Sequence, residues 1–367
     1  MIVKIGIVGL GLIGGSIAKT LKQFNAAHSD IIAYDKDKEA LIQAQKDGII
    51  NKISPAVGSE FTDCNIVFIC TPVGEIVSIV KKLLKYVAKD CIITDVGSTK
   101  GNILKQVHPL LQDKRIFFIG GHPMAGSEKA GYAASTDYLF ENAYYILTPF
   151  ADTPQFIIFI LQKVIERLGA IPIIVPEGLH DKITATISHV PHIIASSLVN
   201  LVKQTDTKER YLHTLAAGGF KDITRIASGD PTMWQHISIN NKLEIQKVIE
   251  EYISILNKFN EILQKNNNHE ELFTFFNDAK LYRNTFKDGM QSAFIKTYNL
   301  FVDVKDRPGS IATLATILSA NRINLKDIGV VNNREFELGV LRIVFESEDN
   351  RLNAYELLIS HNYKVYY

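Results

Sequence analysis

Residues 2–21 read IVKIGIVGLGLIGGSIAKTL and decide the fold of the first part of the chain. A continuous apolar run typical of a strand enters a glycine-rich turn and continues into a segment with helical spacing. The turn consists of Gly9, Leu10, Gly11, Leu12, Ile13 and Gly14. Between a strand and a helix, Gly9 permits the tight turn, Gly11 lets backbone approach a pyrophosphate, and Gly14 lets the helix pack closely on the strand. The phosphates are then expected at the helix N-terminus, where unpaired N–H groups favour an anion.

The next strand-like run, DIIAYD, ends at Asp35. A carboxylate there can accept both ribose hydroxyls of NAD and repels the 2′-phosphate of NADP. Lys36 and Lys38 follow and weaken that preference, because a nearby cation can accommodate a phosphate. We therefore predict a NAD-binding domain of Rossmann type. The alternative is a glycine-rich turn that holds no ligand.

Three more strand-like runs end on polar residues. NIVFICTPV ends at Thr71, CIITDVGS at Ser98 and RIFFIGGHPM at His122. Alternating apolar strands and helical stretches predict a parallel sheet, whose ligands bind beyond the carboxyl ends of the strands. One crevice is therefore expected to be lined by Gly9, Asp35, Thr71, Ser98 and His122. We also expect Gly120, Gly121 and Ala125 to leave room for cofactor and substrate.

The bulk composition excludes several classes of function. The 367 residues suggest two or three domains. Lys and Arg total 40 against 39 Asp and Glu, so no basic field favours nucleic acid. Three cysteines are too few for a disulfide framework. No leader pattern precedes the first strand, and we expect no membrane-spanning run, so a cytoplasmic protein with a small-molecule substrate is predicted.

The middle of the chain reads as helical. The strand signal stops after GAIPIIVP (169–176), and two long segments then carry apolar residues at helical spacing, which predicts a helical domain and an intertwined homodimer. His189 and His192 share a helix face but lack a third metal ligand, so no metal is expected; one of them is as well suited to a structural role as to a substrate contact. Arg225 suits a carboxylate, or else pairs with Asp222 at the surface.

Five motifs carry a family resemblance: GLGLIGGS, DVGSTKG, GGHPMAGSEKAG, SHVPH and GGFKDITRIASGDPTMW. Over residues 1–285 the chain resembles the prephenate dehydrogenases of tyrosine biosynthesis. The glycine-rich motif occurs in many dehydrogenases, whereas HPMAGSE and GFKDITRIA are specific. The resemblance implies oxidative decarboxylation of prephenate to 4-hydroxyphenylpyruvate, with NAD reduced and CO2 released.

The resemblance also implies three catalytic residues. His122 matches the catalytic histidine that accepts the proton of the ring 4-hydroxyl. A neutral imidazole with a pKa near ~6.5 is suited to that task. Ser98 matches the serine that positions this histidine and the nicotinamide, and Glu128 matches a loop acid that tunes electrostatics and access.

On the substrate side, the resemblance assigns Arg225 to a prephenate carboxylate, His192 to a substrate contact and Trp234 to the pocket wall. Prephenate carries two carboxylates, so its pocket needs cationic donors. Lys221, in the same motif as Arg225, is a further candidate for the substrate pocket.

The C-terminal segment reads strand, helix, strand, strand, helix, strand, an order that predicts a ferredoxin-like fold. DRPGSIATLATIL and NRINLKDI resemble the ACT domain, an amino-acid-sensing module. The resemblance implies tyrosine or phenylalanine as an effector, bound where ACT units pair; the alternative is a structural unit without a ligand. The candidate effector residues are Asp306, Gly309, Ser310 and Asn324.

We therefore predict four segments: a NAD-binding domain at 1–172, a helical substrate and dimerisation domain at 173–285, a linker at 286–298 and an ACT domain at 299–367. Arogenate dehydrogenase and dual-specificity cyclohexadienyl dehydrogenase remain alternatives, because no residue separates their substrates from prephenate. A hydroxyacid dehydrogenase would make the specific motifs coincidental. A non-catalytic amino-acid sensor is disfavoured by the intact His122, Ser98 and Arg225.

Overall fold

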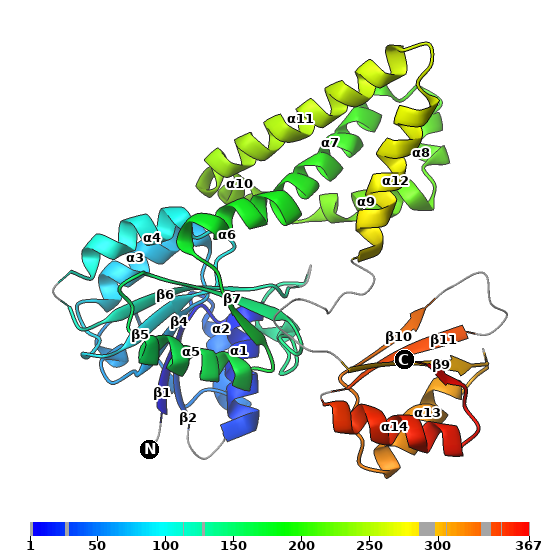
Figure 1. The fold of residues 1–367 in the computed structure, drawn as a ribbon. Coiled ribbons are helices and arrows are strands. Elements are labelled where there is room, and N and C mark those ends of the chain that lie inside the picture. Colours follow the sequence, from blue (N-terminus) through cyan, green and yellow to red (C-terminus); the bar gives the residue numbers. More distant parts are fainter. Residues whose placement is uncertain are drawn as a thin grey trace. The chain divides into compact units, whose positions relative to one another are not determined.

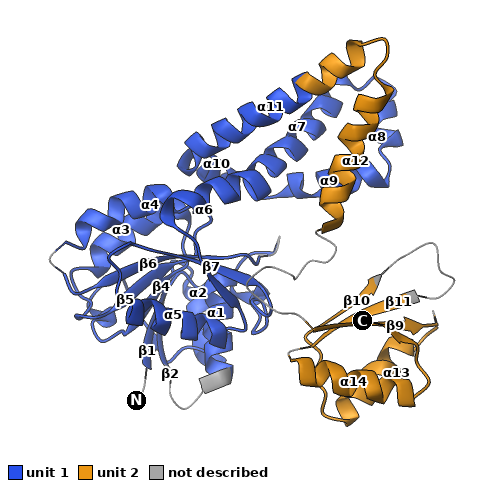
Figure 2. Ribbon diagram, in the orientation of Figure 1, with its two compact units in different colours: residues 1–257 blue, residues 258–367 orange. Residues whose placement is uncertain are grey.

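The computed structural model describes residues 3–25, 29–112, 114–126, 129–285, 298–305, 307–331, 339–345 and 347–366. The chain divides into two compact units, residues 1–257 and 258–367 (Figure 2). The first holds a large sheet with its covering helices and the helical residues that follow up to 257, and the second holds the helical residues from 258 to 285 and a small sheet (Figure 1). The boundaries of the four predicted segments stay predictions.

The large sheet has eight strands in the order β3-β2-β1-β4-β5-β6-β7-β8. Its strands are β1 (Val3–Val8), β2 (Ser29–Tyr34), β3 (Lys52–Ile53), β4 (Ile66–Ile69), β5 (Ile92–Asp95), β6 (Phe117–Pro123), β7 (Tyr144–Pro149) and β8 (Ile171–Ile174). Strands β1 to β6 are parallel, as predicted, but β7 pairs with β6 in the antiparallel sense and β8 runs parallel to β7. The order reverses between β1 and β4, which places a ligand crevice at their carboxyl ends.

Helices cover both faces of this sheet (Figure 1). They are α1 (Leu12–Asn25), α2 (Lys38–Lys46), α3 (Val73–Leu83), α4 (Gly101–Val107) and α5 (Gln155–Arg167). Ile17 of α1 and Leu161 of α5 join one buried cluster, and Ile76 of α3 and Leu104 of α4 join the other. Because side chains alternate across each strand, β1 contributes Ile7 to the first cluster and Val8 to the second.

The next helical run has a π-helical turn in its middle. It comprises α6 (Glu177–Thr184), η4 (Ala185–His189) and α7 (Val190–Thr205). In this turn the N–H of Val190 donates to the carbonyl of Ala185. Pro191 follows and has no N–H to donate, which accounts for the broken helical ladder at this point. Single π turns inside helices are frequent at functional sites, and this one ends on His189.

By length and composition alone, the run Glu177–Thr205 could cross a membrane, which departs from the expectation that no such run exists. One helix of this kind is a weak indication, because core helices of soluble proteins pass the same test. Here Asp181, near the start of the run, accepts hydrogen bonds from the first residues of α4. The run is therefore attached to the sheet-bearing part of the unit.

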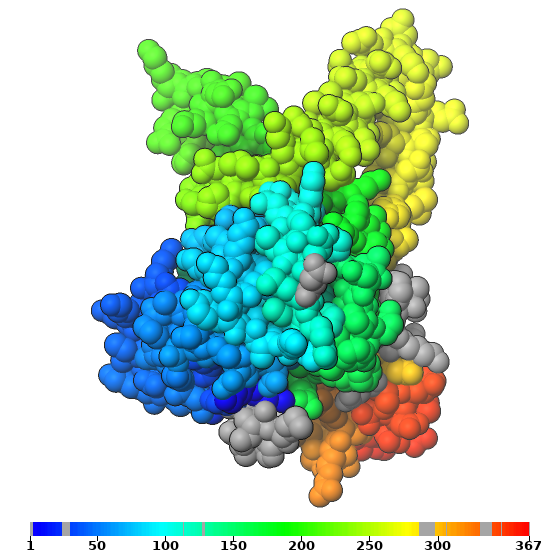
Figure 3. Space-filling view, turned by 90° about the vertical axis from the view of Figure 1, so that its left-hand side faces the viewer, coloured from blue at the N-terminus to red at the C-terminus, as the bar shows by residue number. Residues whose placement is uncertain are grey.

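Six more helical elements follow among the described residues. They are α8 (Tyr211–Leu215), α9 (Gly218–Thr224), η5 (Arg225–Ser228), α10 (Pro231–Asn240), α11 (Lys242–Gln264) and α12 (His269–Thr285). Asp230 caps α10 by accepting from Thr232 N–H, and Pro231 occupies the first helical position. α10 packs against α3, and in the space-filling view yellow-green residues lie on the blue-to-cyan part of the chain (Figure 3).

The small sheet follows the predicted ferredoxin-like order. It is built from β9 (Tyr298–Val304), α13 (Ser310–Ala320), β10 (Asp327–Val331), β11 (Gly339–Phe345), α14 (Glu348–Ser360) and β12 (Val365–Tyr366). The strands are antiparallel in the order β10-β11-β9-β12. Leu314 of α13 and Leu358 of α14 are fully buried against one face. The predicted linker lies outside the described residues except for Tyr298, which begins β9.

Candidate functional site

The glycine-rich turn has the geometry that a dinucleotide requires. Gly9 has a φ of +97°, and a Cβ there would lie 2.6 Å from the carbonyl oxygen of Cys70. A Cβ on Gly14 would collide with the carbonyl oxygen of Gly9, so α1 begins hard against the turn. Gly11 is different, because nothing lies within 4 Å of the position of its Cβ. That open space is where a pyrophosphate can approach the backbone.

Asp35 and Thr71 flank this turn at the ends of β2 and β4. Oδ2 of Asp35 accepts from the N–H of Leu10 at 2.5 Å, so the carboxylate lies beside the turn. The hydroxyl oxygen of Thr71 is buried and has no hydrogen-bond partner among the described residues. Buried hydroxyls are normally paired, and a bound dinucleotide would supply a partner. The residues present therefore fit the predicted cofactor.

His122 lies near the carboxyl end of β6 and begins a chain of polar contacts. Its half-buried ring places Nδ1 3.0 Å from Nε2 of His180, which is fully buried on α6. Nδ1 of His180 lies 2.8 Å from Oδ1 of Asp181. The carboxylate of Asp181 accepts from the N–H groups of Lys100, at 2.7 Å, and of Gly101, at 2.9 Å. A donor–acceptor chain thus runs from the strand end to the N-terminus of α4.

His180 and Asp181 were not predicted as site residues. They stand side by side in the segment LHDKITATISH, whose only signal was adjacent groups able to form a His–carboxylate pair. The contact between His122 and His180 joins residues 58 positions apart, and no local spacing indicates it.

Burial sets the protonation of this chain. It lowers the pKa of His122 well below its ordinary value, and the positive charge of Lys100 and the neighbouring His180 act in the same direction. Burial also lowers the pKa of His180, although its hydrogen bond to Asp181 opposes the change. For Asp181, burial raises the pKa, but the hydrogen bonds from His180, Lys100 and Gly101 outweigh it and hold the pKa below its usual range. His122 is therefore a neutral imidazole near pH 7, as a base must be.

The glycines before His122 serve packing, and the expectation that they leave room for ligands is wrong. A Cβ on Gly120 would collide with the Thr148 hydroxyl and lie 2.8 Å from Cδ of Lys100. A Cβ on Gly121 would collide with the carbonyl oxygen of Asp95. The two glycines therefore bring β6 close to β5 and β7.

Two more catalytic candidates are Ser98 and Glu128. Ser98 is half-buried between β5 and α4, three positions beyond the end of β5 (98 − 95 = 3), at the same edge of the sheet as His122. Glu128 lies outside the described residues.

The two histidines of the SHVPH motif have different surroundings. His189 is buried, and its Nδ1 lies 3.0 Å from Nδ2 of Asn241, which also donates to the carbonyl of Asp181 at 2.8 Å. His192 stacks on Trp234, with ring centroids 3.5 Å apart and planes at 18°. The structure thus gives His189 the structural role and brings His192 together with Trp234. Among the described residues, no group of three potential metal ligands occurs.

Gly229 allows this stacking. A Cβ at this position would lie 2.7 Å from Nε1 of Trp234 and 3.1 Å from Cε1 of His192. Lys221 and Arg225 are exposed on α9 and η5, two short elements that pack against α7, the helix of His192. Their contacts with substrate stay predictions.

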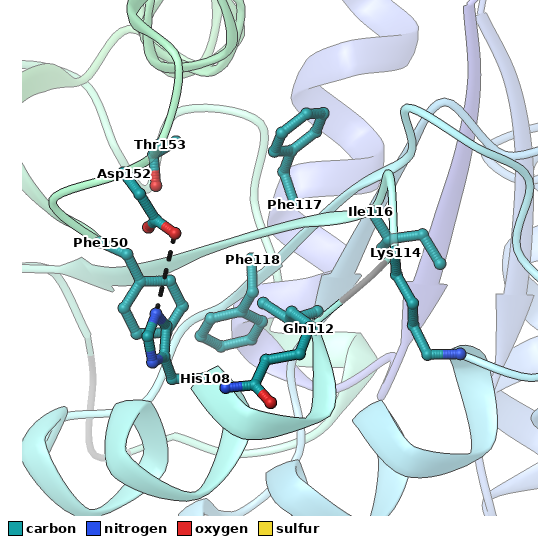
Figure 4. Close-up of a pocket in the computed structure, with 10 residues that line it drawn as sticks. His108, Gln112, Lys114, Ile116, Phe117, Phe118, Phe150, Asp152 and Thr153 are labelled. Carbon is teal, nitrogen blue, oxygen red and sulfur yellow. Dashed lines mark ion pairs between the residues drawn. The ribbon is translucent and has the colours of Figure 1, made fainter.

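Two cavities lie in the sheet-bearing part of the unit, one beside Asp181 and one at the opposite edge of the sheet from His122. One of about 590 Å³ lies behind Asp181 and Asn241, between α4, α6 and the start of α11. Another of about 340 Å³ lies where β6 begins and β7 ends, the edge opposite His122. There His108 and Asp152 face each other, with Nε2 and Oδ2 3.9 Å apart (Figure 4). None of the predicted site residues lines this second cavity.

The candidate effector residues are divided between the two ends of α13. Gly309, with a φ of +87°, and Ser310 lie at its N-terminus, whereas Asn324 lies beyond its C-terminus beside a hollow of about 490 Å³. At 1.5 Å per residue, the two ends of this helix are about 16 Å apart. One chain therefore does not gather these residues into a single pocket. Asp306 lies outside the described residues.

Comparison with known proteins agrees with this geometry. The family model described as the nucleotide-binding domain of prephenate dehydrogenase matches residues 17–174, and that of its dimerization domain matches residues 176–278. The prephenate dehydrogenase of Bacillus subtilis is 37% identical over 363 residues, which cover 98% of this chain and 97% of that protein.

Two solved structures are also similar. Prephenate dehydrogenase from A. aeolicus, in complex with hydroxyphenyl propionate and NAD+, is 33% identical with a TM-score of 0.72, covering 78% of this chain and 99% of that one. Synechocystis arogenate dehydrogenase is 28% identical with a TM-score of 0.70, covering 77% and 99%. The family models, the full-length relative and the NAD-compatible sheet edge lead to one conclusion: this chain belongs to the prephenate dehydrogenase family.

Proposed function

We propose that His122 is the general base of this chain's reaction. The activity is that of prephenate dehydrogenase, an NAD-dependent oxidoreductase of tyrosine biosynthesis. Oxidation removes a hydride from the hydroxyl-bearing ring carbon while His122 takes the proton of its hydroxyl. Loss of CO2 then leaves an aromatic phenolate, which takes that proton back. The observation that carries the assignment is the position of the His122 imidazole at the carboxyl end of β6, on the edge that also holds the glycine-rich turn. Burial lowers the pKa of this imidazole, which favours its neutral form.

Bound NAD would be held by the turn 9–14, Asp35 and Thr71, and it supplies the acceptor for the hydride. Ser98, beyond the end of the neighbouring strand, positions the His122 ring and the nicotinamide in this proposal. Glu128, which follows His122 in the sequence, tunes access and charge in this proposal.

The substrate side of the proposal uses the helices. Arg225 binds a carboxylate of prephenate through its planar fork, and Lys221 adds a second cation. His192 and Trp234 form a stacked wall of the pocket. The position of α9 and η5 against α7 supports this grouping, because it places the Arg225 segment beside the helix of His192.

Replacement of the base tests the proposal. His122→Asn removes the proton acceptor, and kcat is expected to fall by roughly two to four orders of magnitude, the usual contribution of one general base. Arg225→Ala should mainly raise KM for prephenate. An unchanged kcat in the His122 variant would refute the base assignment.

A second candidate function is arogenate or dual-specificity cyclohexadienyl dehydrogenase. The similarity to the Synechocystis arogenate dehydrogenase favours keeping it. The two substrates differ only in an amino group in place of a keto oxygen. NADH formation, followed by absorbance with prephenate or arogenate and with NAD or NADP, separates the four combinations.

Dimerisation, regulation and location complete the proposal. We propose a cytoplasmic location. A homodimer is supported by the dimerization-domain match and by exposed apolar side chains on the helices, such as Leu215 at 75% and Leu243 at 72% exposure. Tyrosine or phenylalanine is proposed to bind where two small-sheet units pair, so that Gly309 and Ser310 of one copy meet Asn324 of another. Calorimetry and kinetics with either amino acid test this, and no response in both would exclude it.

A further inference from the structure

We infer that His180 and Asp181 are positioning residues that fix the tautomer of His122, so that Nε2 of His122 carries the free lone pair for the substrate hydroxyl. The inference rests on the proposed role of His122 as the base. It goes beyond that proposal because it assigns the protonation of four ring nitrogens and names two residues that never touch the substrate.

The carboxylate of Asp181 fixes the first tautomer, because an ionised carboxylate can only accept hydrogen bonds. Its Oδ1 accepts from the N–H of Lys100 and its Oδ2 from the N–H of Gly101. Backbone N–H groups are donors under all conditions, so both oxygens face fixed donors and the ionised carboxylate is favoured. Oδ1 therefore also accepts from Nδ1 of His180, 2.8 Å away, and that nitrogen carries a hydrogen.

The next link is His180. Its side chain is fully buried, and a neutral imidazole has one N–H and one lone pair. Because the hydrogen is on Nδ1, the lone pair is on Nε2. Nε2 lies 3.0 Å from Nδ1 of His122, so Nδ1 of His122 must be the donor. A doubly protonated His180 would force the opposite tautomer on His122.

Burial favours the neutral ring of His180. Asp181 and Asp95 act to raise its pKa, while Lys100 and burial act to lower it, and the lowering prevails. Asp95 is largely neutralised by its own contact with the Lys100 ammonium. With both rings neutral, His122 has Nδ1–H on the protein side and a bare Nε2 on the other.

This arrangement keeps His122 in the one neutral tautomer that can accept the hydroxyl proton. A free imidazole exchanges its proton between the two nitrogens, and a His122 with Nε2–H could not accept the hydroxyl proton. When reaction protonates Nε2, the Nδ1–H bond to His180 is already made and needs no rearrangement. After CO2 is lost, the phenolate oxygen of the product takes the proton back from Nε2, and Nδ1–H stays in place.

Direct observation of the tautomer is the first test. In ¹⁵N-histidine-labelled enzyme without substrate, the His122 ring is expected to show a protonated Nδ1 and an unprotonated Nε2 near pH 7, with assignment through the His122→Asn spectrum. A protonated Nε2 on His122 in the wild-type spectrum would overturn the inference. This measurement needs no destabilising variant.

Variants give the second test. Asp181→Asn keeps the shape but turns one acceptor into a donor, so kcat should fall by roughly 10²- to 10⁴-fold, as for a carboxylate that orients a catalytic histidine. His180→Gln should lower kcat in the same direction. KM for prephenate should change by less than about fivefold in both, since neither residue touches the substrate, and the His122 Nε2–H signal should grow.

Asp206→Asn is the matched control. Asp206 also accepts from backbone N–H groups, those of Thr207, Leu212 and His213, but it bonds no catalytic histidine. Its kcat should equal that of wild type. NAD binding, followed through the fluorescence of Trp234, shows which variants are folded.

The two proposals fail separately. If His122→Asn keeps its kcat, the base assignment is wrong. If His122→Asn loses activity while folded Asp181→Asn and His180→Gln keep wild-type kcat and tautomer signals, the base stands and the tautomer role is wrong.

Discussion

The ammonium nitrogen of Lys100 lies 2.5 Å from Oδ2 of Asp95, and neither side chain is exposed. The same nitrogen donates to the carbonyl oxygens of Gly97, at 2.8 Å, and Thr99, at 3.0 Å. All three ammonium protons therefore have acceptors, which is the condition under which a buried charge is tolerated. Burial still lowers the pKa of Lys100, and Asp95 opposes that change.

This ion pair lies between the end of β5 and the strand that carries His122. Oδ1 of Asp95 accepts from the N–H of Gly121, the residue before His122, at 3.2 Å. Lys100→Met leaves the Asp95 charge buried without its partner, and we expect a loss of about 3–5 kcal/mol in the free energy of unfolding. Urea denaturation measures it. Lys4→Met, which removes only an exposed pair with Asp63, should leave the midpoint near wild type, and equal midpoints for both variants would contradict the prediction.

The glycines of the turn 9–14 should separate by function. Gly14→Ala forces a Cβ against the carbonyl oxygen of Gly9 and should cost about 1–3 kcal/mol or more in the free energy of unfolding. Gly11→Ala enters open space, so it should leave the unfolding midpoint near wild type while weakening NAD binding. Denaturation and NAD titration of both variants test the contrast. A Gly11 variant that binds NAD normally would place the pyrophosphate elsewhere.

The sequence predicts the first part of the fold well because the signals there are local. An apolar run, a glycine turn and a helical segment indicate β1 and α1 from adjacent residues alone. The reversed direction of β7 was not predicted, because strand direction depends on how the chain returns to the sheet. The described residues between 124 and 143 contain no long helix to indicate a parallel crossover.

The site residues show the same difference between local signals, which the sequence reveals, and tertiary contacts, which it does not. Asp35, Thr71, Ser98 and His122 were predicted from strand ends, because the carboxyl ends of parallel strands meet at one edge. The partner of His122 was not, because α6 reaches β6 only through tertiary packing. Gly120 and Gly121 were misinterpreted for a related reason: a glycine beside a candidate base indicates close approach, but the sequence does not reveal whether a ligand or a neighbouring strand makes it.

Asp35 should decide between the two dinucleotides. Asp35→Asn keeps an acceptor for the N–H of Leu10 but removes the charge that favours the ribose hydroxyls and repels a 2′-phosphate. KM for NAD is expected to rise roughly tenfold, which corresponds to the lower end of the free energy contributed by a hydrogen bond to a charged group. The preference for NAD over NADP should shrink. Steady-state kinetics with both cofactors measure this.

The control for this variant is Asp37→Ala. Asp37 caps α2 by accepting from the N–H groups of Glu39 and Ala40, so its loss should cost about 1 kcal/mol of stability. KM for NAD should stay unchanged. A similar rise of KM in both variants would show that loop stability, and not the Asp35 charge, sets the affinity.

His189 should make the protein less stable in mild acid. Its ring is buried and its Nδ1 faces the amide nitrogen of Asn241, a donor, so protonation there would bring two donors together. Burial lowers the pKa of His189 to about 4, against an ordinary value of 6.5. Between these values the unfolded chain binds the proton and the folded chain does not, so the stabilising contribution is complete above 6.5 and is lost as pH falls toward 4.

The full effect of that shift is about 3 kcal/mol, at 1.36 kcal/mol for each pKa unit. His189→Gln removes the titration, so its free energy of unfolding should fall less steeply between pH 6.5 and 4 than that of wild type, even if its value at pH 7 is lower. Urea denaturation at four pH values across this range gives the two slopes. Burial lowers the pKa values of His122, His180 and His192 as well, so wild type and variant should both lose stability with acid, and only the difference between their slopes reports His189. Parallel slopes would mean that His189 binds its proton equally well in the folded and unfolded chain. The contact of its Nδ1 with the Asn241 amide opposes that result.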